Sequence, residues 1–165
     1  MAVTATTTVP APVERVVETF ADEAFVRHVA QKAGATLESF ELAGPTDGAF
    51  TVTTVRSMSA ERLPDVAKKF VGASVRLTQT DAYGAPAADG SRTVRSDIAV
   101  ASLPVSGSAD QILRPLGEQT EVHVDCTVEA KIPIVGKKVA AAAEPYVSKA
   151  LSLQSREAQA WLSGR

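Results

Sequence analysis

The segment EVHVDCTVEA, residues 121–130, limits the possible folds more than any other part of the sequence. Its even positions carry valine, cysteine or alanine, and its odd positions carry glutamate, histidine, aspartate or threonine. Alternation with a period of two predicts a strand of an antiparallel sheet that has one face on a core and the other in water. Weaker alternation occurs at 50–54 and 94–100. Such a sheet needs helices to cover its apolar face.

Clusters of Gly, Pro, Asp and Ser separate the extended segments, which together predict a seven-stranded sheet. The expected strands cover residues 3–9, 35–43, 49–57, 73–82, 92–102, 107–114 and 119–130. The facing of the sixth strand is ambiguous, because Ile112 has the opposite parity to Gln111 and Leu113. A simple alternation rule therefore misjudges one of its two faces.

Helices are expected in three parts of the chain. Apolar spacing from Val13 onward predicts two short helices in tandem, with Asp22 as the N-cap of the second and Gly34 as its stop. The segment LPDVAKKFV, 63–71, predicts one or two helical turns. The longest helix extends over about residues 136–162, and at 1.5 Å per residue it is about 40 Å long, enough to cross a sheet.

The first turns of this long helix are rich in alanine, whereas its larger apolar side chains lie toward the C-terminal half. Two explanations remain open. The alanines let the helix approach the sheet backbone closely, or they leave a space under the helix for a ligand. Because protein cores are normally packed without voids, close packing is the default explanation.

Length and composition restrict the class of protein. The 165 residues fit a single domain spanning 1–165, which would bury roughly 70% of the surface of its unfolded chain. A net charge of −2 offers no basic field for nucleic acid. Cys126 is the single cysteine, so no internal disulfide is expected and a cytoplasmic location is the simpler hypothesis. Without a signal-peptide pattern or an apolar run of about 18 residues, we expect a soluble protein with no stable membrane anchoring.

Standard catalytic and ligand-binding motifs are missing from the sequence, including G-x-S-x-G, a phosphate loop and metal-ligand spacing. His123 and Asp125 lie two apart beside Glu121, but on the polar face of their strand, so no metal site is expected there. Cys126 shares the parity of the valines and is interpreted as a buried apolar residue rather than a reactive thiol. We predict no catalytic residue, no metal and no cofactor.

Four segments resemble a known family: TTTVPAPVERVVETFADEAF at 6–25, LPDVAKKFVG at 63–72, YGAPAADGSRT at 83–93 and IPIVGKKV at 132–139. With the order strand, two short helices, six strands and long helix, the chain resembles a bacterial family of unknown function. That family belongs to the START-like (SRPBCC) superfamily, which includes polyketide cyclases and birch-pollen-allergen-like proteins. The resemblance covers nearly the whole chain.

The resemblance implies an α+β helix-grip fold, in which a curved antiparallel seven-stranded sheet carries two short helices and a long C-terminal helix across its concave face. It also implies a cavity between sheet and helix, where members of the wider superfamily mostly bind lipids, sterols, hormones or polyketides. It implies no catalytic residues. With it, the ligand explanation of the alanines becomes as acceptable as close packing.

Strand parity and the resemblance together predict binding of a small hydrophobic or amphipathic ligand, such as a lipid, polyketide or sterol-like molecule, without its conversion. The residues expected to line the cavity are Phe50, Val52, Thr54, Val75, Leu77, Gln79, Ser96, Ile98, Val124, Cys126, Val139, Ala143 and Tyr146. Sparse polar groups among them, such as Thr54, Gln79 and Ser96, would orient a ligand.

Two other functions stay open. An enzyme of cyclase or dehydratase type should place a His, Glu, Tyr or Arg with a shifted pKa in the cavity. An interaction protein without a ligand should have a filled core and an exposed apolar patch. The expected partner is a small apolar molecule, and the oligomeric state is not predicted.

Overall fold

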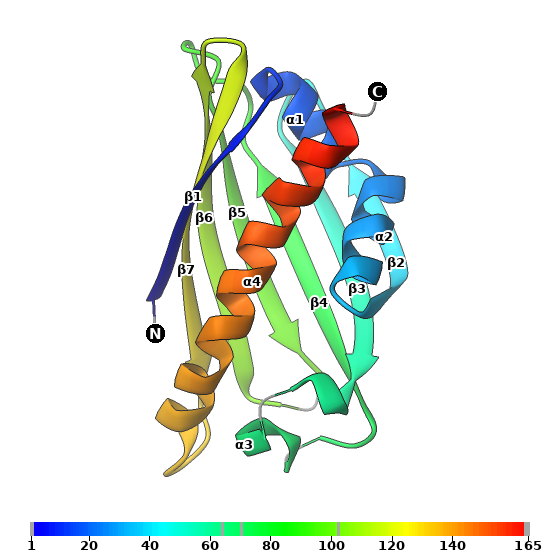
Figure 1. Ribbon diagram of the computed structural model, residues 1–165, viewed down its shortest axis with the longest axis vertical. Helices are drawn as coiled ribbons and strands as arrows, with labels where there is room; N and C mark the ends of the chain where they lie inside the picture. The colour runs from blue at the N-terminus through cyan, green and yellow to red at the C-terminus, as the bar shows by residue number, and fades with distance from the viewer. Residues whose placement is uncertain (1, 64, 70, 102, 164–165) are drawn as a thin grey trace.

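A computed structural model describes residues 2–63, 65–69, 71–101 and 103–163 of the chain (Figure 1). In chain order its elements are β1 (Ala2–Val9), α1 (Val13–Phe20), α2 (Glu23–Lys32), β2 (Ala35–Ala43), β3 (Phe50–Ser59), the 3-10 turn η1 (Ala60–Arg62), α3 (Asp65–Lys68), β4 (Ser74–Tyr83), β5 (Arg92–Val100), β6 (Val105–Leu116), β7 (Gln119–Ala130) and α4 (Gly136–Ser163). The strands and the long helix lie where the sequence predicts them, to within a few residues at each end.

The strands form one antiparallel sheet in the order β1-β7-β6-β5-β4-β3-β2. From β2 to β7 each strand pairs with the next one along the chain, whereas β1 joins the opposite edge beside β7. The chain crosses from β1 to β2 through α1 and α2, which lie on the same face of the sheet as α4 (Figure 1). The predicted α+β helix-grip architecture is confirmed.

The two tandem helices are those that the apolar spacing predicts. In α1, Val13 and Phe20 are buried. α2 begins at the predicted N-cap, where the Asp22 carboxylate accepts a hydrogen bond from the backbone N–H of Ala24 at 3.0 Å. Gly34 follows α2 with φ at 79°, a left-handed conformation that glycine adopts without steric cost.

α4 crosses the sheet diagonally, packing along β1 and β7 and against the other helices (Figure 1). The hydroxyl of Thr7 in β1 donates to that of Ser155 in α4 at 2.7 Å. The helix begins at Gly136, where a Cβ would collide with the carbonyl oxygen of Ala130. Within the described part of the chain, no helix is long and apolar enough to span a membrane.

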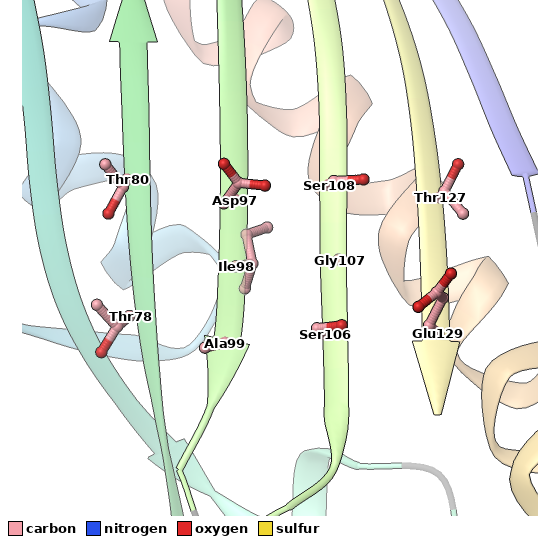
Figure 2. A pocket seen from close by; sticks show the side chains of 10 residues that line it. All are labelled: Thr78, Thr80, Asp97, Ile98, Ala99, Ser106, Gly107, Ser108, Thr127 and Glu129. Carbon is pink, nitrogen blue, oxygen red and sulfur yellow. The ribbon is translucent and has the colours of Figure 1, made fainter. Parts of the chain in front are cut away.

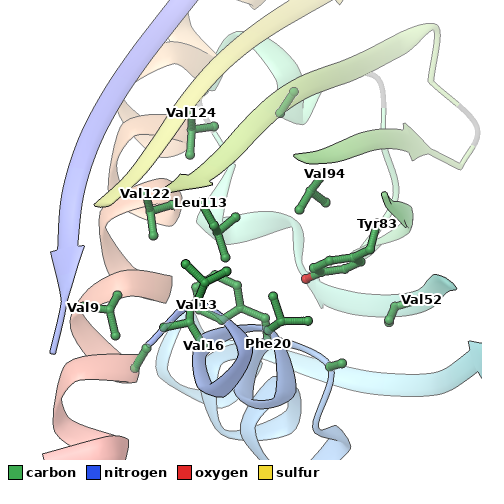
Figure 3. Close-up of a cluster of buried hydrophobic side chains, with 14 of the residues drawn as sticks. Val9, Val13, Val16, Phe20, Val52, Tyr83, Val94, Leu113, Val122 and Val124 are labelled. Carbon is green, nitrogen blue, oxygen red and sulfur yellow. The ribbon is translucent and has the colours of Figure 1, made fainter. Parts of the chain in front are cut away.

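The main apolar core extends along the inner side of α4, and it includes Ala140 of α4, Val3 of β1 and Val128 of β7 as well as the side chains around α1 (Figure 3). Val16 of α1, Leu113 of β6 and Val122 of β7 are fully buried there. Phe25 of α2 meets Trp161 of α4 edge to face, with ring centroids 5.5 Å apart. The large side chains at the end of α4 thus belong to this core.

Candidate binding site on the inner face of the sheet

The face of the sheet that α1 and α4 cover is called the inner face below. The strand register aligns its side chains in rows that cross the sheet. Near α1, one row contains Phe50, Tyr83 and Val94, which are 4%, 5% and 2% exposed (Figure 3). Phe50 and Tyr83 stack with ring centroids 4.3 Å apart. We call this region the packed end.

The inner face becomes partly exposed toward the end of the sheet that carries α3. The partly exposed inner-face residues there are Arg56, Met58, Leu77, Gln79, Ile98, Val100, Val105 and Gly107. We call this region the open end. α4 begins at this end of the molecule, so its alanine-rich turns lie here over β1 and β7, with Ala140 buried and Ala142 and Ala143 partly exposed (Figure 1). Solvent therefore reaches the inner face at the open end.

Four polar side chains form a network on the inner face between its two ends. Nη2 of Arg56 donates to Oε1 of Gln79. The amide nitrogen of Gln79 in turn donates to both oxygens of the Asp81 carboxylate, at 2.9 and 3.2 Å. The hydroxyl of Ser96 donates to Asp81 at 2.5 Å. Gln79 thus connects a guanidinium and a carboxylate that do not form a direct ion pair.

Burial shifts the pKa of each charged group toward its neutral form. It raises the pKa of Asp81, although the hydrogen bonds from Ser96 and Gln79 and the charge of Arg56 act in the opposite direction. Burial lowers the pKa of Arg56, and the charge of Asp81 partly offsets that effect. Burial and the Asp81 charge also raise the pKa of Tyr83. The groups with shifted pKa values, Arg56, Asp81 and Tyr83, therefore lie on one part of the inner face.

Most residues predicted to line a cavity lie on or beside the inner face. Those that are buried are Phe50, Val52, Thr54, Val75, Ser96, Val124, Cys126 and Val139. Those that are partly exposed are Leu77, Gln79, Ile98 and Ala143. Burial raises the pKa of the Cys126 thiol, which fits its interpretation as an unreactive core residue. Contact of these residues with a ligand stays a prediction.

Tyr146 lies elsewhere than expected. Its side chain is 50% exposed, whereas Ala143, Val147 and Leu151 pack against the core. At about 100° per residue, Tyr146 lies about a third of a turn away from this row. Residues 143, 147 and 151 therefore lie on the inward side of α4, and contact of the half-exposed Tyr146 with a ligand stays a prediction.

Arg56 and Asp81 were not among the predicted site residues, although a signal for both was present. Arg56 shares the parity of Phe50 and Val52 in β3, and Asp81 shares that of Leu77 and Tyr83 in β4. Charged side chains are rarely buried, so they are assigned to solvent by default. Strict use of parity would have placed both on the inner face.

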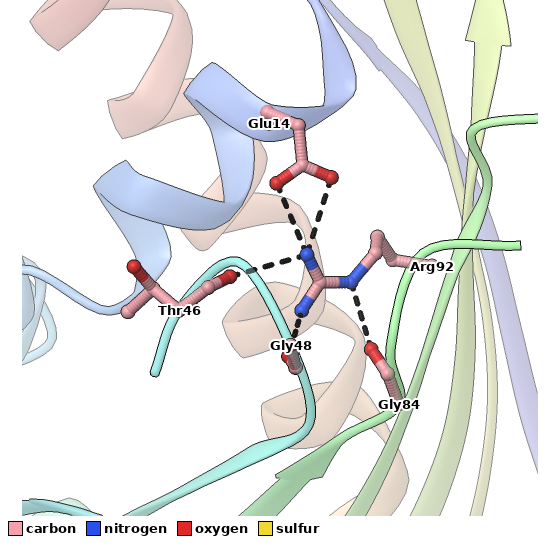
Figure 4. A network of polar contacts seen from close by, with 5 residues as sticks. All are labelled: Glu14, Thr46, Gly48, Gly84 and Arg92. Carbon is pink, nitrogen blue, oxygen red and sulfur yellow. Dashed lines mark hydrogen bonds and ion pairs between the residues drawn. The ribbon is translucent and has the colours of Figure 1, made fainter. Parts of the chain in front are cut away.

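Arg92 is a second arginine that sequence reasoning left without a role. It belongs to the YGAPAADGSRT segment and is 0% exposed. Its Nε donates to the carbonyl of Gly84 at 2.8 Å, and its Nη2 donates to that of Gly48 at 2.8 Å (Figure 4). Its Nη1 donates to both Glu14 carboxylate oxygens, at 3.1 and 3.0 Å, and to the carbonyl of Thr46 at 3.2 Å. Arg92 thus ties α1 to two loops at the packed end.

The outer face of the sheet carries hollows that are lined by both polar and apolar groups. One hollow is lined by threonine and serine side chains together with Asp97 and Glu129, on the side of the sheet away from α4 (Figure 2). On the same face, His123 contacts Thr6 at 2.8 Å and Asp125 at 3.3 Å. Among the described residues, no group of three or more His, Cys, Asp or Glu side chains is arranged to hold a metal ion.

Proteins of known structure share this fold. The Zhui aromatase/cyclase from Streptomyces sp. R1128 has a TM-score of 0.60 at 15% identity, covering 97% of this chain and 92% of its own. Ara h 8.0201 has a TM-score of 0.59 at 12% identity, covering 100% of this chain and 99% of its own. TTHA0849 from Thermus thermophilus has a TM-score of 0.56 at 20% identity, covering 97% and 98%. These similarities show the helix-grip fold.

Relatives by sequence cover most of the chain. The uncharacterized protein Rv0481c of Mycobacterium tuberculosis is 22% identical over 133 residues, which are 78% of this chain and 76% of its own. The uncharacterized protein Mb0491c of Mycobacterium bovis gives the same values. A family model described as "Protein of unknown function (DUF2505)" matches residues 4–162. The chain therefore belongs to the DUF2505 family, as the four quoted segments indicated.

Proposed function

We propose that this protein binds a small hydrophobic or amphipathic molecule between the inner face of the sheet and α4, without converting it. A lipid, a polyketide or a sterol-like molecule would fit this description. The observation that carries the proposal is the partial exposure of inner-face side chains at the open end, where the alanine-rich turns of α4 begin.

This exposure bears on the two explanations of the alanines. α4 packs closely on β1 and β7, where Val139 and Ala140 are buried, so close packing accounts for that part of the helix. Farther across the inner face, Leu77 of β4 and Ile98 and Val100 of β5 remain partly accessible to water. Leaving apolar surface in water costs roughly 25 cal/mol per Å², and an apolar ligand would remove that cost. The partly exposed apolar side chains at the open end therefore support a binding role.

An enzyme of cyclase or dehydratase type is the second candidate. It is favoured by the inner-face groups with shifted pKa values, among which the raised pKa of Asp81 would suit proton transfer at a higher pH. It ranks second because Asp81 already accepts hydrogen bonds from Gln79 and Ser96, and Tyr83 is buried under its stack with Phe50. If a molecule that is purified with the protein is isolated and added back to it, a product that accumulates with time would favour the enzyme.

The first test is native mass spectrometry of the protein purified from a bacterial host, followed by extraction and identification of any small molecule released. We expect an apolar or amphipathic molecule at close to one per chain. Bare protein that also shows no thermal shift across a library of lipids and aromatic compounds would reject the proposal. In that case, association measured by gel filtration would favour an interaction protein.

Gly107 allows a test of where the ligand binds, with Ser106 as the matched control position. It aligns with Ile98 and Val128 on the inner face, and a Cβ there would make ordinary contacts, 3.7 Å from the carbonyl oxygen of Thr127 and 3.9 Å from Cβ of Ile98. Gly107→Val should therefore fold and should weaken binding of the neutral probe N-phenyl-1-naphthylamine by about tenfold. Ser106→Val adds a similar side chain on the outer face and should leave binding unchanged. Equal binding by both variants would place the probe elsewhere.

A further inference from the structure

Arg56 has an incomplete set of hydrogen bonds. Within the described residues, two buried side-chain polar atoms have no partner in the protein, Nε of Arg56 and Oε1 of Gln111. A buried donor without an acceptor costs about 1–3 kcal/mol, and more when the group is charged. Such atoms are uncommon in folded proteins and call for an explanation, of which a missing ligand is one.

The nearby carboxylate does not complete Arg56. Asp81 accepts from Gln79 and Ser96, and its influence on Arg56 is only through its charge. The guanidinium presents five N–H donors in a planar fork that matches a carboxylate. One of them is used by Oε1 of Gln79. Among the residues that the structure describes, none therefore places an anionic group in direct contact with this fork.

The surroundings of Arg56 are apolar and accessible. In the strand register it lies opposite Leu77, which in turn lies opposite Val100, and both are partly exposed. An oxygen acceptor bound at Arg56 would thus place the rest of a molecule over apolar side chains of the open end. Gln111, the other residue with an orphaned atom, aligns with Val94 at the packed end, about 20 Å away along the strands, and belongs to a different place.

We propose that Arg56 binds the carboxylate of an amphipathic acid whose apolar part lies over Leu77 and Ile98 at the open end. This inference rests on the proposed binding function and names the chemical class of the ligand. The carboxylate accepts hydrogen bonds from donors of the Arg56 fork that Gln79 does not use and that the partial exposure of this side chain leaves accessible. Gln79 accepts from Nη2 of Arg56 and is itself held by its hydrogen bonds to Asp81.

The test compares dodecanoic acid with dodecanol, which has the same apolar chain and no charge, as competitors of N-phenyl-1-naphthylamine on the full chain. We expect the acid to displace the probe from the wild-type protein at a concentration about tenfold or more below that of the alcohol, since hydrogen bonds to charged groups are the stronger ones. In Arg56→Gln this preference should disappear while the affinity for dodecanol stays the same. Arg76→Gln removes an equal charge from an exposed site of β4 and should keep the preference.

The outcomes separate the inference from the function on which it rests. Equal displacement by acid and alcohol in the wild type would reject the carboxylate site but leave ligand binding standing. A preference for the acid that survives in Arg56→Gln would assign it to another cation. If the probe does not bind and no competitor shifts the melting temperature of the wild type, the binding function fails and the inference fails with it.

Discussion

Two arginines on the inner face of the same sheet are held in very different ways. Arg92 is fully buried at the packed end, where each of its three nitrogens donates to protein oxygens and Glu14 balances its charge. Arg56 is partly exposed at the open end, where Nη2 donates to Gln79 and Nε has no partner. The N–H donors of a guanidinium lie in one plane and need acceptors in that plane. Only the site of Arg92 provides an acceptor for each nitrogen.

The difference separates a stabilising role from a binding role. A buried charge is tolerated when the protein surrounds it with acceptors, and it then connects distant segments. Arg92 does this for α1, the β2–β3 loop and the segment after β4. Arg56, a partly exposed guanidinium next to accessible apolar surface, is instead suited to an external acceptor. The packed end thus closes the fold, and the open end carries the candidate site.

The largest expected effect follows removal of Arg92. Arg92→Met should lower the free energy of unfolding by about 3–5 kcal/mol, because it leaves several carbonyl oxygens and the Glu14 carboxylate without their donor. Arg92→Lys keeps the charge but not the fork, so its loss should be smaller. Urea denaturation followed by circular dichroism measures both. A loss below about 1 kcal/mol for Arg92→Met would contradict the stabilising role.

Replacement of Arg56 should cost much less stability. Arg56→Met removes one protein hydrogen bond and the positive charge near Asp81, but it also removes the cost of an unpaired buried donor, so the free energy of unfolding should fall by only about 1–2 kcal/mol. The partly exposed Gln79 can bind water in its place. The same denaturation experiment compares this variant directly with Arg92→Met. A loss as large as that of Arg92→Met would show that Arg56 also holds the fold together.

These two arginines also mark what the sequence could and could not predict. Alternation in β7 predicted the sheet, because a side-chain period of two leaves no other regular structure. Parity then placed Thr54, Gln79 and Ser96 on the inner face. Parity applies equally to Arg56 and Arg92, but charged side chains are rarely buried, so the sequence alone favours solvent for both. Burial of an arginine depends on acceptors from distant segments, and no local pattern reveals them.

The facing of β6 and α4 needed the structure for a similar reason. In β6, Leu113 is buried and Gln111 shares its face, so the apolar Ile112 is the residue on the outer side. In α4, the alanines are small on every side and do not define a face. The larger residues Val147 and Leu151 pack against the core and define it instead. Small or mixed segments acquire their orientation only from what packs against them.

Asp81 gives a smaller effect that depends on pH. Its pKa in the folded protein is raised above the unfolded value of about 3.9, so its contribution to stability is largest below about pH 3.9 and is lost as the pH rises through the folded-state pKa. Asp81→Asn removes the ionisable carboxyl group, so the variant lacks this dependence on pH. The free energy of unfolding of the variant minus that of the wild type should therefore increase with pH above about 4, by about 1.4 kcal/mol per unit of raised pKa, and then level off.

Denaturant titrations at several pH values between about 3.5 and 8 measure this difference. Ser96→Ala sharpens the test, because the Ser96 hydroxyl lowers the pKa of Asp81 and its removal should extend the pH-dependent window upward. A difference between Asp81→Asn and wild type that stays constant over this range would mean that Asp81 is not desolvated on the inner face. The network would then be as well solvated as an exposed ion pair.

The smallest expected effect comes from the partner of Arg92. Glu14 receives two hydrogen bonds from Nη1 of Arg92, yet its side chain is 51% exposed. Glu14→Gln keeps one acceptor oxygen, and water compensates for the lost charge, so the free energy of unfolding should fall by less than about 1 kcal/mol, measured by urea denaturation at low salt. The two ends of one ion pair thus contribute unequally, because the cost of a change depends on what the remaining groups can still bind. If Glu14→Gln cost as much as Arg92→Met, the carboxylate rather than the three backbone carbonyls would hold Arg92 in place.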